Sequence, residues 1–150
     1  MYHVIMTMLI AAVPIIELRG AIPIGVAAGL DVPTALIASI IGNMLPVPII
    51  ILFVRKVFAW MRGISEKLNH FVCKMEAKAA SKKEVIDKYE WWGLVILVAI
   101  PLPGTGAWTG TLAASILDMD FKSTVIAVML GVLLAGVIMM TAGALGFSLL

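Results

Sequence analysis

The segment Val-Pro-Ile-Ile-Glu-Leu-Arg-Gly-Ala-Ile-Pro, from Val13 to Pro23, interrupts an apolar stretch that covers residues 4–30. A second apolar stretch, 91–117, is interrupted by Pro-Leu-Pro-Gly-Thr-Gly at 101–106. Proline in a helix interior costs about 3 kcal/mol and glycine about 1 kcal/mol, so neither stretch suits a continuous helix. Each arm that remains is about half of the roughly 20 residues that a spanning helix needs. We therefore predict two re-entrant helical hairpins, over 4–30 and 91–117, that turn back near the membrane midplane.

Two further apolar stretches, 33–54 and 123–149, are long enough to cross a membrane as continuous helices. Neither contains a charged residue, and a spanning helix needs about 20 apolar residues at about 1.5 Å rise each. Asp31 stands before Pro33 as an N-cap for the first of these helices. Pro46 and Pro48 are expected to kink that helix. The predicted fold is an all-α integral membrane protein with two hairpins and two transmembrane helices.

The composition supports a membrane domain, because 62% of the residues are hydrophobic, only 13% are charged and the mean hydropathy is +1.10. A soluble domain is about half apolar and a quarter charged. One membrane domain over residues 1–150 is the natural count for this length. A net charge of +2 gives no support for nucleic-acid binding.

Metal, cofactor and enzyme chemistry find no support in the sequence. Cys73 is the only cysteine, so no internal disulfide can form, and His3 and His70 lack metal-ligand spacing. The chain has no HExxH, GxSxG or Walker motif. We therefore expect no catalytic residues, no metal and no cofactor, and we do not expect an enzyme.

The basic residues set the expected orientation of the chain. Nine of the eleven Lys and Arg lie between Arg55 and Lys88, and loops rich in these residues stay in the cytoplasm. The loop 55–90 is therefore predicted to be cytoplasmic, and both termini extracytoplasmic, in a multi-pass protein of the cell membrane. Apolar residues recur every three or four positions along the loop, which predicts an amphipathic helical linker. Such a linker lies on anionic lipid or packs on the protein itself.

The two halves, 1–54 and 91–150, then share one plan in opposite orientations, which is the inverted-topology repeat of many secondary transporters. Gly20-Ala21 and Ala27-Ala28 recur with constant spacing as Gly106-Ala107 and Ala113-Ala114. Chance is the alternative explanation for so few identities.

Glu17 and Arg19 form the one charged pair inside an apolar stretch. A charge near the bilayer centre costs at least about 2.5 kcal/mol and is a functional candidate by default. Arg19 is the candidate for binding an anionic headgroup, because its guanidinium stays charged and offers forked donors. Glu17 is the candidate proton-coupling group, although burial and Arg19 act on its pKa in opposite directions and the sequence leaves the sign open. The alternative is a structural pair in which the two charges neutralise each other.

The tip of the second hairpin offers hydroxyl groups and free backbone N–H groups, and broken helix N-termini bind anions. The residues predicted to bind a phosphate from the side opposite to Arg19 are Gly104, Thr105, Gly106, Trp108 and Thr109. Alternatively, Thr109 caps the returning arm and Trp108 only packs. Asn43 in the span 33–54 is a secondary candidate, and such a residue more often makes a helix–helix hydrogen bond.

The motifs Glu-Leu-Arg-Gly-Ala-Ile-Pro at 17–23 and Pro-Leu-Pro-Gly-Thr-Gly-Ala-Trp-Thr-Gly at 101–110 resemble the putative small multidrug export family of bacteria and archaea. The resemblance covers nearly the whole chain. That family is similar in plan to the DedA (SNARE-associated, VTT) superfamily, whose members are associated with polyprenyl-phosphate recycling, lipid scrambling and proton-dependent transport. The resemblance implies two facing re-entrant hairpins, with Glu17 as the embedded acid and Arg19 as an embedded arginine. DedA proteins usually keep an arginine near the second proline-glycine turn, where this chain has Thr105.

Three functions are compatible with these features. The first is a transporter or flippase for an anionic amphiphile, with a lipid-linked phosphate such as polyprenyl phosphate favoured by Arg19 and with protons as the coupling ion. The second is a proton-coupled small multidrug exporter of organic cations. The third is a non-transporting membrane assembly factor whose loop binds partners. Membrane lipids are expected partners, and the small cavity expected of two half-repeats favours a homodimer.

Overall fold

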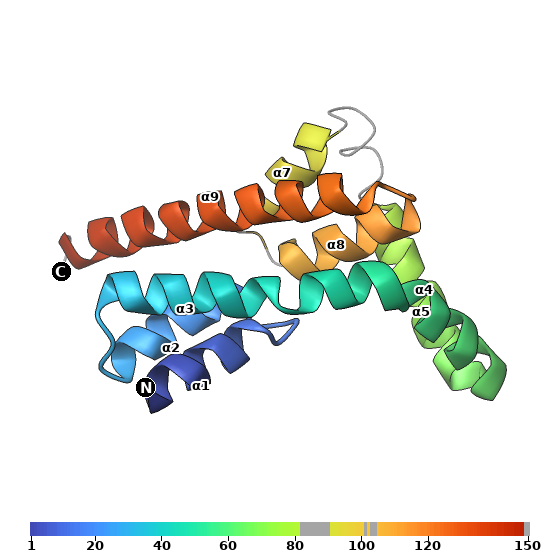
Figure 1. The fold of residues 1–150 in the computed structure, drawn as a ribbon, viewed down its shortest axis with the longest axis horizontal. Helices are drawn as coiled ribbons and strands as arrows, with labels where there is room; N and C mark the ends of the chain where they lie inside the picture. Colours follow the sequence, from blue (N-terminus) through green and yellow to red (C-terminus); the bar gives the residue numbers. More distant parts are fainter. Residues whose placement is uncertain (82–90, 101, 103–104, 149–150) are drawn as a thin grey trace.

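The computed structural model describes the whole chain except residues 82–90, 101, 103–104 and 149–150, and it describes no side chain at 79 or at 143–148. Every regular element in the described part of the chain is an α-helix. The helices are α1 (Tyr2–Ala11), α2 (Glu17–Ala27), α3 (Val32–Met44), α4 (Pro46–Ile64), α5 (Glu66–Ala80), α7 (Trp91–Ala99), α8 (Ala107–Ile116) and α9 (Phe121–Ser148) (Figure 1).

Two helical segments are long and apolar enough to cross a membrane. One is Val32–Ile64, which comprises α3 and α4 and has a mean hydropathy of 2.3, and the other is Phe121–Ala142 of α9, with a mean hydropathy of 2.6. The break between α3 and α4 lies at the predicted proline, because Pro46 has no N–H for the helical hydrogen-bond ladder. Leu45 before it keeps helical dihedral angles (φ −56°, ψ −46°), so α4 continues along α3 (Figure 1).

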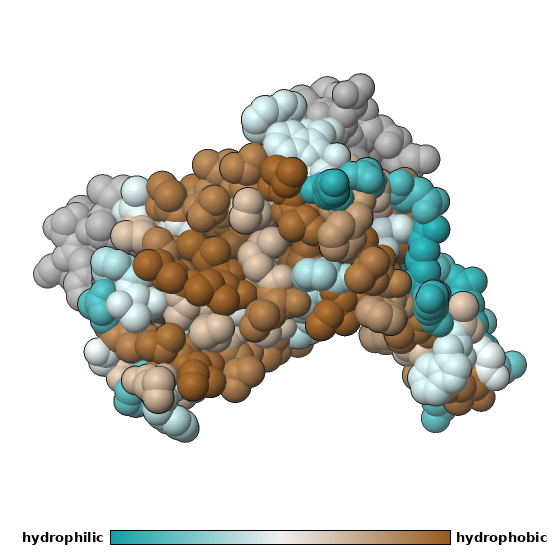
Figure 2. All heavy atoms as spheres, viewed as in Figure 1, coloured by the Kyte–Doolittle hydropathy of each residue, from teal (hydrophilic) through white to brown (hydrophobic). Residues whose placement is uncertain are grey.

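The outer faces of these segments are apolar and exposed. The exposed hydrophobic side chains are Ile37, Ile41, Leu45, Ile49, Leu52 and Phe53 on α3, α4 and the break between them, and Ile126, Met129, Leu133, Leu134, Val137 and Ile138 on α9. Figure 2 shows a broad hydrophobic surface over the middle of the molecule, with hydrophilic residues gathered at the end that holds α5. A soluble monomer rarely exposes so large an apolar surface. The chain is therefore a membrane protein with transmembrane helices.

Two pairs of short helices turn back inside the molecule. The first pair, α1 and α2, has 10 and 11 residues and packs against α3. The second pair, α7 and α8, has 9 and 10 residues and packs against α9 and α4. A helix of ten residues is about 15 Å long. Figure 1 shows the start of α1 and the last described turns of α9 at one end of the molecule, and α5 at the other end.

The two halves of the chain contain equivalent helices in the same order. α7 begins as many residues after α1 as α9 begins after α3. The first pair of starts is Tyr2 and Trp91, and the second is Val32 and Phe121. Each long helix also starts after an aspartate whose carboxylate accepts a backbone N–H bond of 3.1 Å. Two short helices are thus followed by a long helical segment in each half, α3 with α4 in the first and α9 in the second.

The ends of α2 and α8 correspond as well. Gly29 (φ 96°) and Asp118 (φ 58°) both adopt a left-handed conformation, and two equivalent backbone hydrogen bonds close both turns, from Ala28 and Leu30 in the first and from Leu117 and Met119 in the second. Glycine is the usual residue for such a helix end, and aspartate is one of the few others that tolerates it. The separation along the chain between equivalent helix starts is longer than the separation between Gly20 and Gly106. The glycine–alanine pairs noted in the sequence are therefore not structurally equivalent.

The charged linker folds as two helices separated at one residue. α4 continues beyond the predicted end of the span at Val54 as far as Ile64, and Ser65 then adopts an extended conformation (φ −158°, ψ 154°). The Oγ atom of Ser65 accepts a hydrogen bond from the backbone N–H of Leu68 at 3.3 Å, which caps α5. α5 then packs against α4 and α8, so the linker returns toward the second pair of short helices.

Candidate functional site between the two helix pairs

Glu17 begins α2 and carries its carboxylate to the start of α8. The residue is buried, with 4% of its surface exposed, and its Oε1 atom accepts a hydrogen bond from the backbone N–H of Trp108 at 3.2 Å. Glu17 has a positive φ of 51°, which costs a residue with a Cβ about 1–2 kcal/mol. The free N–H groups and partial positive charge of a helix N-terminus stabilise a carboxylate at this place. Glu17 therefore caps α8.

Gly106 makes this close approach possible. It stands directly before α8 with a φ of 122°, and a Cβ atom there would overlap the Oε2 atom of Glu17. A residue with a side chain would therefore meet both backbone strain and a steric clash. Gly106 is required by the shape of the site and by its backbone conformation.

Arg19 reaches the end of α7. Its Nη1 atom donates to the carbonyl of Leu102 at 2.6 Å, and its Nη2 atom donates to the carbonyl of Ile100 at 2.8 Å and to Thr105 Oγ1 at 3.2 Å. These carbonyls follow the last helical residue of α7, where a cation is favourable. The Nε atom of Arg19 is buried and has no hydrogen-bond partner in the part of the chain that the structure describes.

Trp108 of the second helix pair makes a hydrogen bond to the first helix pair. Its indole Nε1 atom donates to the carbonyl of Ala12 at 3.0 Å, at the end of α1. The last carbonyls and the first N–H groups of a helix have no partner within that helix, so a buried helix end needs a partner from elsewhere in the protein. We call the turn of the pair α1–α2 the first tip and the turn of the pair α7–α8 the second tip. The two tips supply these partners to each other, because Glu17 caps α8, Arg19 caps α7 and Trp108 caps α1.

A cavity of about 250 Å³ opens beside these contacts. Its lining residues are Pro14, Ile15, Ile16, Glu17, Arg19, Lys78, Thr105 and Thr109. The cavity thus combines a carboxylate, a guanidinium, an ammonium group and two hydroxyls with apolar side chains of the first tip. Among the described residues that line the cavity, two basic groups stand against one acidic group.

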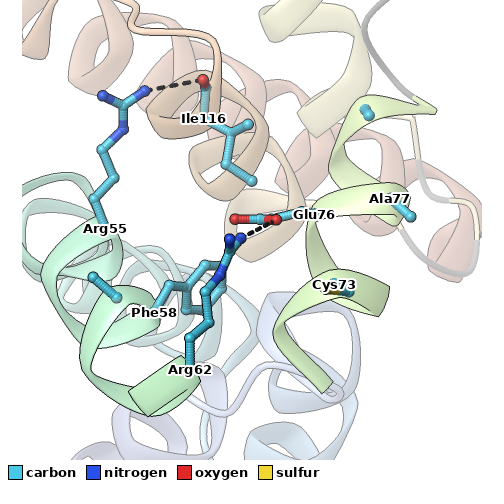
Figure 3. Close-up of a pocket in the computed structure, with 9 residues that line it drawn as sticks. Arg55, Phe58, Arg62, Cys73, Glu76, Ala77 and Ile116 are labelled. Carbon is cyan, nitrogen blue, oxygen red and sulfur yellow. Dashed lines mark hydrogen bonds and ion pairs between the residues drawn. The ribbon is translucent and has the colours of Figure 1, made fainter. Parts of the chain in front are cut away.

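A larger cavity of about 720 Å³ lies between α4, α5 and α8. Arg62 from α4 and Glu76 from α5 point at each other and form an ion pair there (Figure 3). Arg55 donates to two carbonyls at the end of α8 at 2.9 and 3.0 Å and pairs with Asp118 at 2.5 Å. Both arginines of this cavity are therefore already ion-paired.

The structure brings most of the predicted site residues together. Glu17, Arg19, Thr105 and Thr109 line the smaller cavity, whereas the backbone next to Gly106 is occupied by the Glu17 carboxylate. Thr109 lies in the first turn of α8, and the N-cap position belongs to Gly106. Gly104 lies outside the described residues.

Asn43 lies apart from this group. It is fully buried in α3 and lines neither of the two cavities. Neither of its amide atoms has a hydrogen-bond partner among the residues described. No group of three or more His, Cys, Asp or Glu side chains suited to a metal ion occurs in the same described ranges.

Comparison with known families matches residues 17–138 to the family described as putative small multi-drug export protein. The chain belongs to this family. The matched range contains the two hairpin-tip motifs, the linker and all of the polar residues that line the smaller cavity. No curated protein and no solved structure matches the chain.

Two basic residues of this export-family protein were not anticipated as parts of the site. Arg55 caps α8, and its place directly after a long apolar run was a signal that could have indicated a helix-end partner. Lys78 reaches the smaller cavity because the chain folds back at Ser65. No local pattern indicates that contact, because it depends on the tertiary placement of α5.

Proposed function

We propose that this protein is a transporter, not an enzyme, that moves an anionic amphiphile across the cell membrane. A lipid-linked phosphate such as polyprenyl phosphate is the favoured substrate. The observation that carries the proposal is the Glu17 carboxylate at the start of α8, with Arg19 and two threonine hydroxyls in the same cavity. The protein's own carboxylate occupies the place where an anionic oxygen of the substrate would bind. Apolar residues at 14–16 line the same cavity and would contact the substrate's apolar tail.

We further propose that the helix pairs α1–α2 and α7–α8 are re-entrant hairpins of an inverted-topology repeat. Their arms of 9 to 11 residues are about half as long as a bilayer is thick. Equivalent helices begin at a constant separation along the chain, which supports the repeat. The same plan is what the sequence resemblance implied, with two facing re-entrant hairpins. In this arrangement the linker is cytoplasmic and both termini lie outside the cell.

The same site suggests how protons would be coupled to transport. Ionised Glu17 holds the N-terminus of α8 through its charge and its hydrogen bond. A protonated Glu17 has lost that charge and releases the N–H groups to an anionic oxygen of the substrate. Proton uptake and substrate binding at this site are then thermodynamically linked.

We expect Glu17→Gln to bind substrate with a weaker pH dependence than wild type, because glutamine has no proton to exchange and only the substrate phosphate, with a second pKa of about 6, still titrates at the site. The measurement is the affinity for farnesyl phosphate, a short prenyl phosphate, in detergent between about pH 5 and 8, where protein titrations commonly matter. The matched control is Glu76→Gln, which neutralises a carboxylate of the larger cavity. Identical pH dependence of binding in wild type and Glu17→Gln would show that Glu17 is only structural.

Tags at the two termini test the re-entrant arrangement. Two hairpins place both termini outside the cytoplasm, whereas four full crossings would place both inside it. The linker is cytoplasmic in either case, so a tag at its residue 70 serves as the internal control. We expect both terminal tags to react with an impermeant reagent in intact cells, and a protected N-terminal tag would contradict the hairpins.

Export of organic cations is the second candidate, because the family description itself names drug export. A cationic substrate would need the Glu17 carboxylate for itself, yet Arg19 donates to groups at the second tip and Lys78 lines the same cavity. These two cations would repel a cationic drug at short range. The third candidate, a non-transporting assembly factor, requires that neutralising both Glu17 and Arg19 leaves cellular activity intact.

A further inference from the structure

We propose that Lys78 of the linker binds the anionic group of the substrate directly and supplies the excess positive charge of the site. This inference rests on the proposed function and identifies a specificity-determining residue for it. Lys78 lies in the last turn of α5, and it lines the 250 Å³ cavity together with Glu17, Arg19 and the two threonines. The linker would then form one wall of the binding site.

The charge of the cavity supports this role. Glu17 and Arg19 carry opposite charges, so the two hairpin tips alone leave the cavity neutral when both are ionised. Lys78 is the remaining charged residue among the described residues that line it. The excess positive charge that would favour an anionic substrate therefore comes from the linker, and not from the apolar stretches that carry the family motifs.

The hydrogen bonds of the site support it as well. Arg19 directs its two Nη atoms at backbone carbonyls and at Thr105, so much of its donor capacity holds the second tip. Lys78 makes no ion pair and no side-chain hydrogen bond with any residue in the described ranges. An ammonium group on a flexible stem, with three donors, can turn toward a phosphate oxygen.

The position of α5 explains why this lysine, and not its neighbours, would act. α5 packs against α4 and α8, which brings its last turn to the tips of the helix pairs. Lys74 lies one turn earlier on the same face of α5 and does not line the cavity. Lys74 is therefore a matched control for charge, residue type and helix face.

The experiment measures binding of farnesyl phosphate, and of uncharged farnesol, to the full-length protein in detergent. Wild type is compared with Lys78→Gln, Lys78→Arg, Lys74→Gln and Arg19→Ala. We expect Lys78→Gln to weaken farnesyl phosphate binding by about tenfold or more, because it removes a charge-assisted hydrogen bond. We expect Lys78→Arg to keep most of the affinity, Lys74→Gln to stay within about twofold, and farnesol binding to change little in all variants.

The outcomes that differ from these expectations show whether the role of Lys78 or the proposed function itself is wrong. Equal affinity in Lys78→Gln and Lys74→Gln, with binding lost in Arg19→Ala, would overturn the role of Lys78 and leave the proposed function standing. Equal losses in both lysine variants would also overturn it, since diffuse attraction by the linker would explain them. A wild-type protein that binds farnesyl phosphate no better than farnesol would overturn the proposed function itself. Lys78→Arg, which keeps the charge, shows whether any loss in Lys78→Gln comes from misfolding.

Discussion

Arg19→Ala is expected to reduce transport of an anionic amphiphile by at least about a hundredfold, with the protein still inserted in the membrane. The substitution removes the guanidinium from the cavity and leaves the carbonyls of Ile100 and Leu102 without their donors. Arg19→Lys should restore only part of the activity, because an ammonium group cannot reproduce the forked contacts. The measurement is transport by reconstituted vesicles, normalised to the amount of inserted protein.

The matched control for this prediction is Arg62→Ala. Arg62 is also an arginine of a cavity, but its partner in the structure is Glu76, and it lies away from the hairpin tips. We expect Arg62→Ala to retain most of the transport rate. Full activity in Arg19→Ala would remove the anion-binding role of Arg19, whatever the control shows.

Gly106→Ala is expected to have the second large effect, on folding. A Cβ atom at this position would overlap the Glu17 carboxylate, and the φ of 122° is strained for any residue with a side chain. The expected loss of stability is about 3 kcal/mol, which combines backbone strain with displacement of the α8 cap. The measurement is the yield and thermal unfolding midpoint of the purified protein in detergent.

Two variants make this prediction specific. Gly63→Ala is the control, because a Cβ built there has no atom of another described residue within 4 Å beyond its chain neighbours and its own helix backbone, and it should unfold like wild type. The double variant Gly106→Ala with Glu17→Ala removes the clash, so it should recover part of the yield. A Gly106→Ala protein with the stability of Gly63→Ala would contradict the described contact between Gly106 and Glu17.

The sequence was sufficient to predict the helical class, the transmembrane segments and the presence of a break in each shorter apolar stretch, but Gly20 and Pro23, which were expected to break the first stretch, lie inside α2. Proline and glycine act through local backbone chemistry, so Pro46 marks the break between α3 and α4 without any tertiary information. The composition predicted a membrane protein for a similar reason, because the apolar surface must meet lipid. A proline break depends only on neighbouring residues, and the composition is an average over the whole chain, so a single sequence is enough to predict both.

The partners of the charged residues could not be predicted in the same way. Glu17 and Arg19 were recognisable as important, yet the sequence left open whether they neutralise each other. In the structure they reach separate helix ends of the second pair, α8 and α7. The contribution of Lys78 was also hidden, because it depends on where α5 packs after the turn at Ser65. Such contacts join residues far apart in the chain, and no periodicity encodes them.

The most direct test of the central claim is movement of a polyprenyl phosphate across vesicles that contain the purified protein. The lipid is loaded in both leaflets, and a phosphatase added outside hydrolyses only the molecules that reach the outer leaflet. We predict that wild type leads to hydrolysis of nearly all of the lipid, whereas protein-free and Arg19→Ala vesicles stop at the outer-leaflet fraction. Vesicles in which wild type leaves the inner-leaflet phosphate untouched, while exporting a cation such as ethidium, would contradict the proposed function.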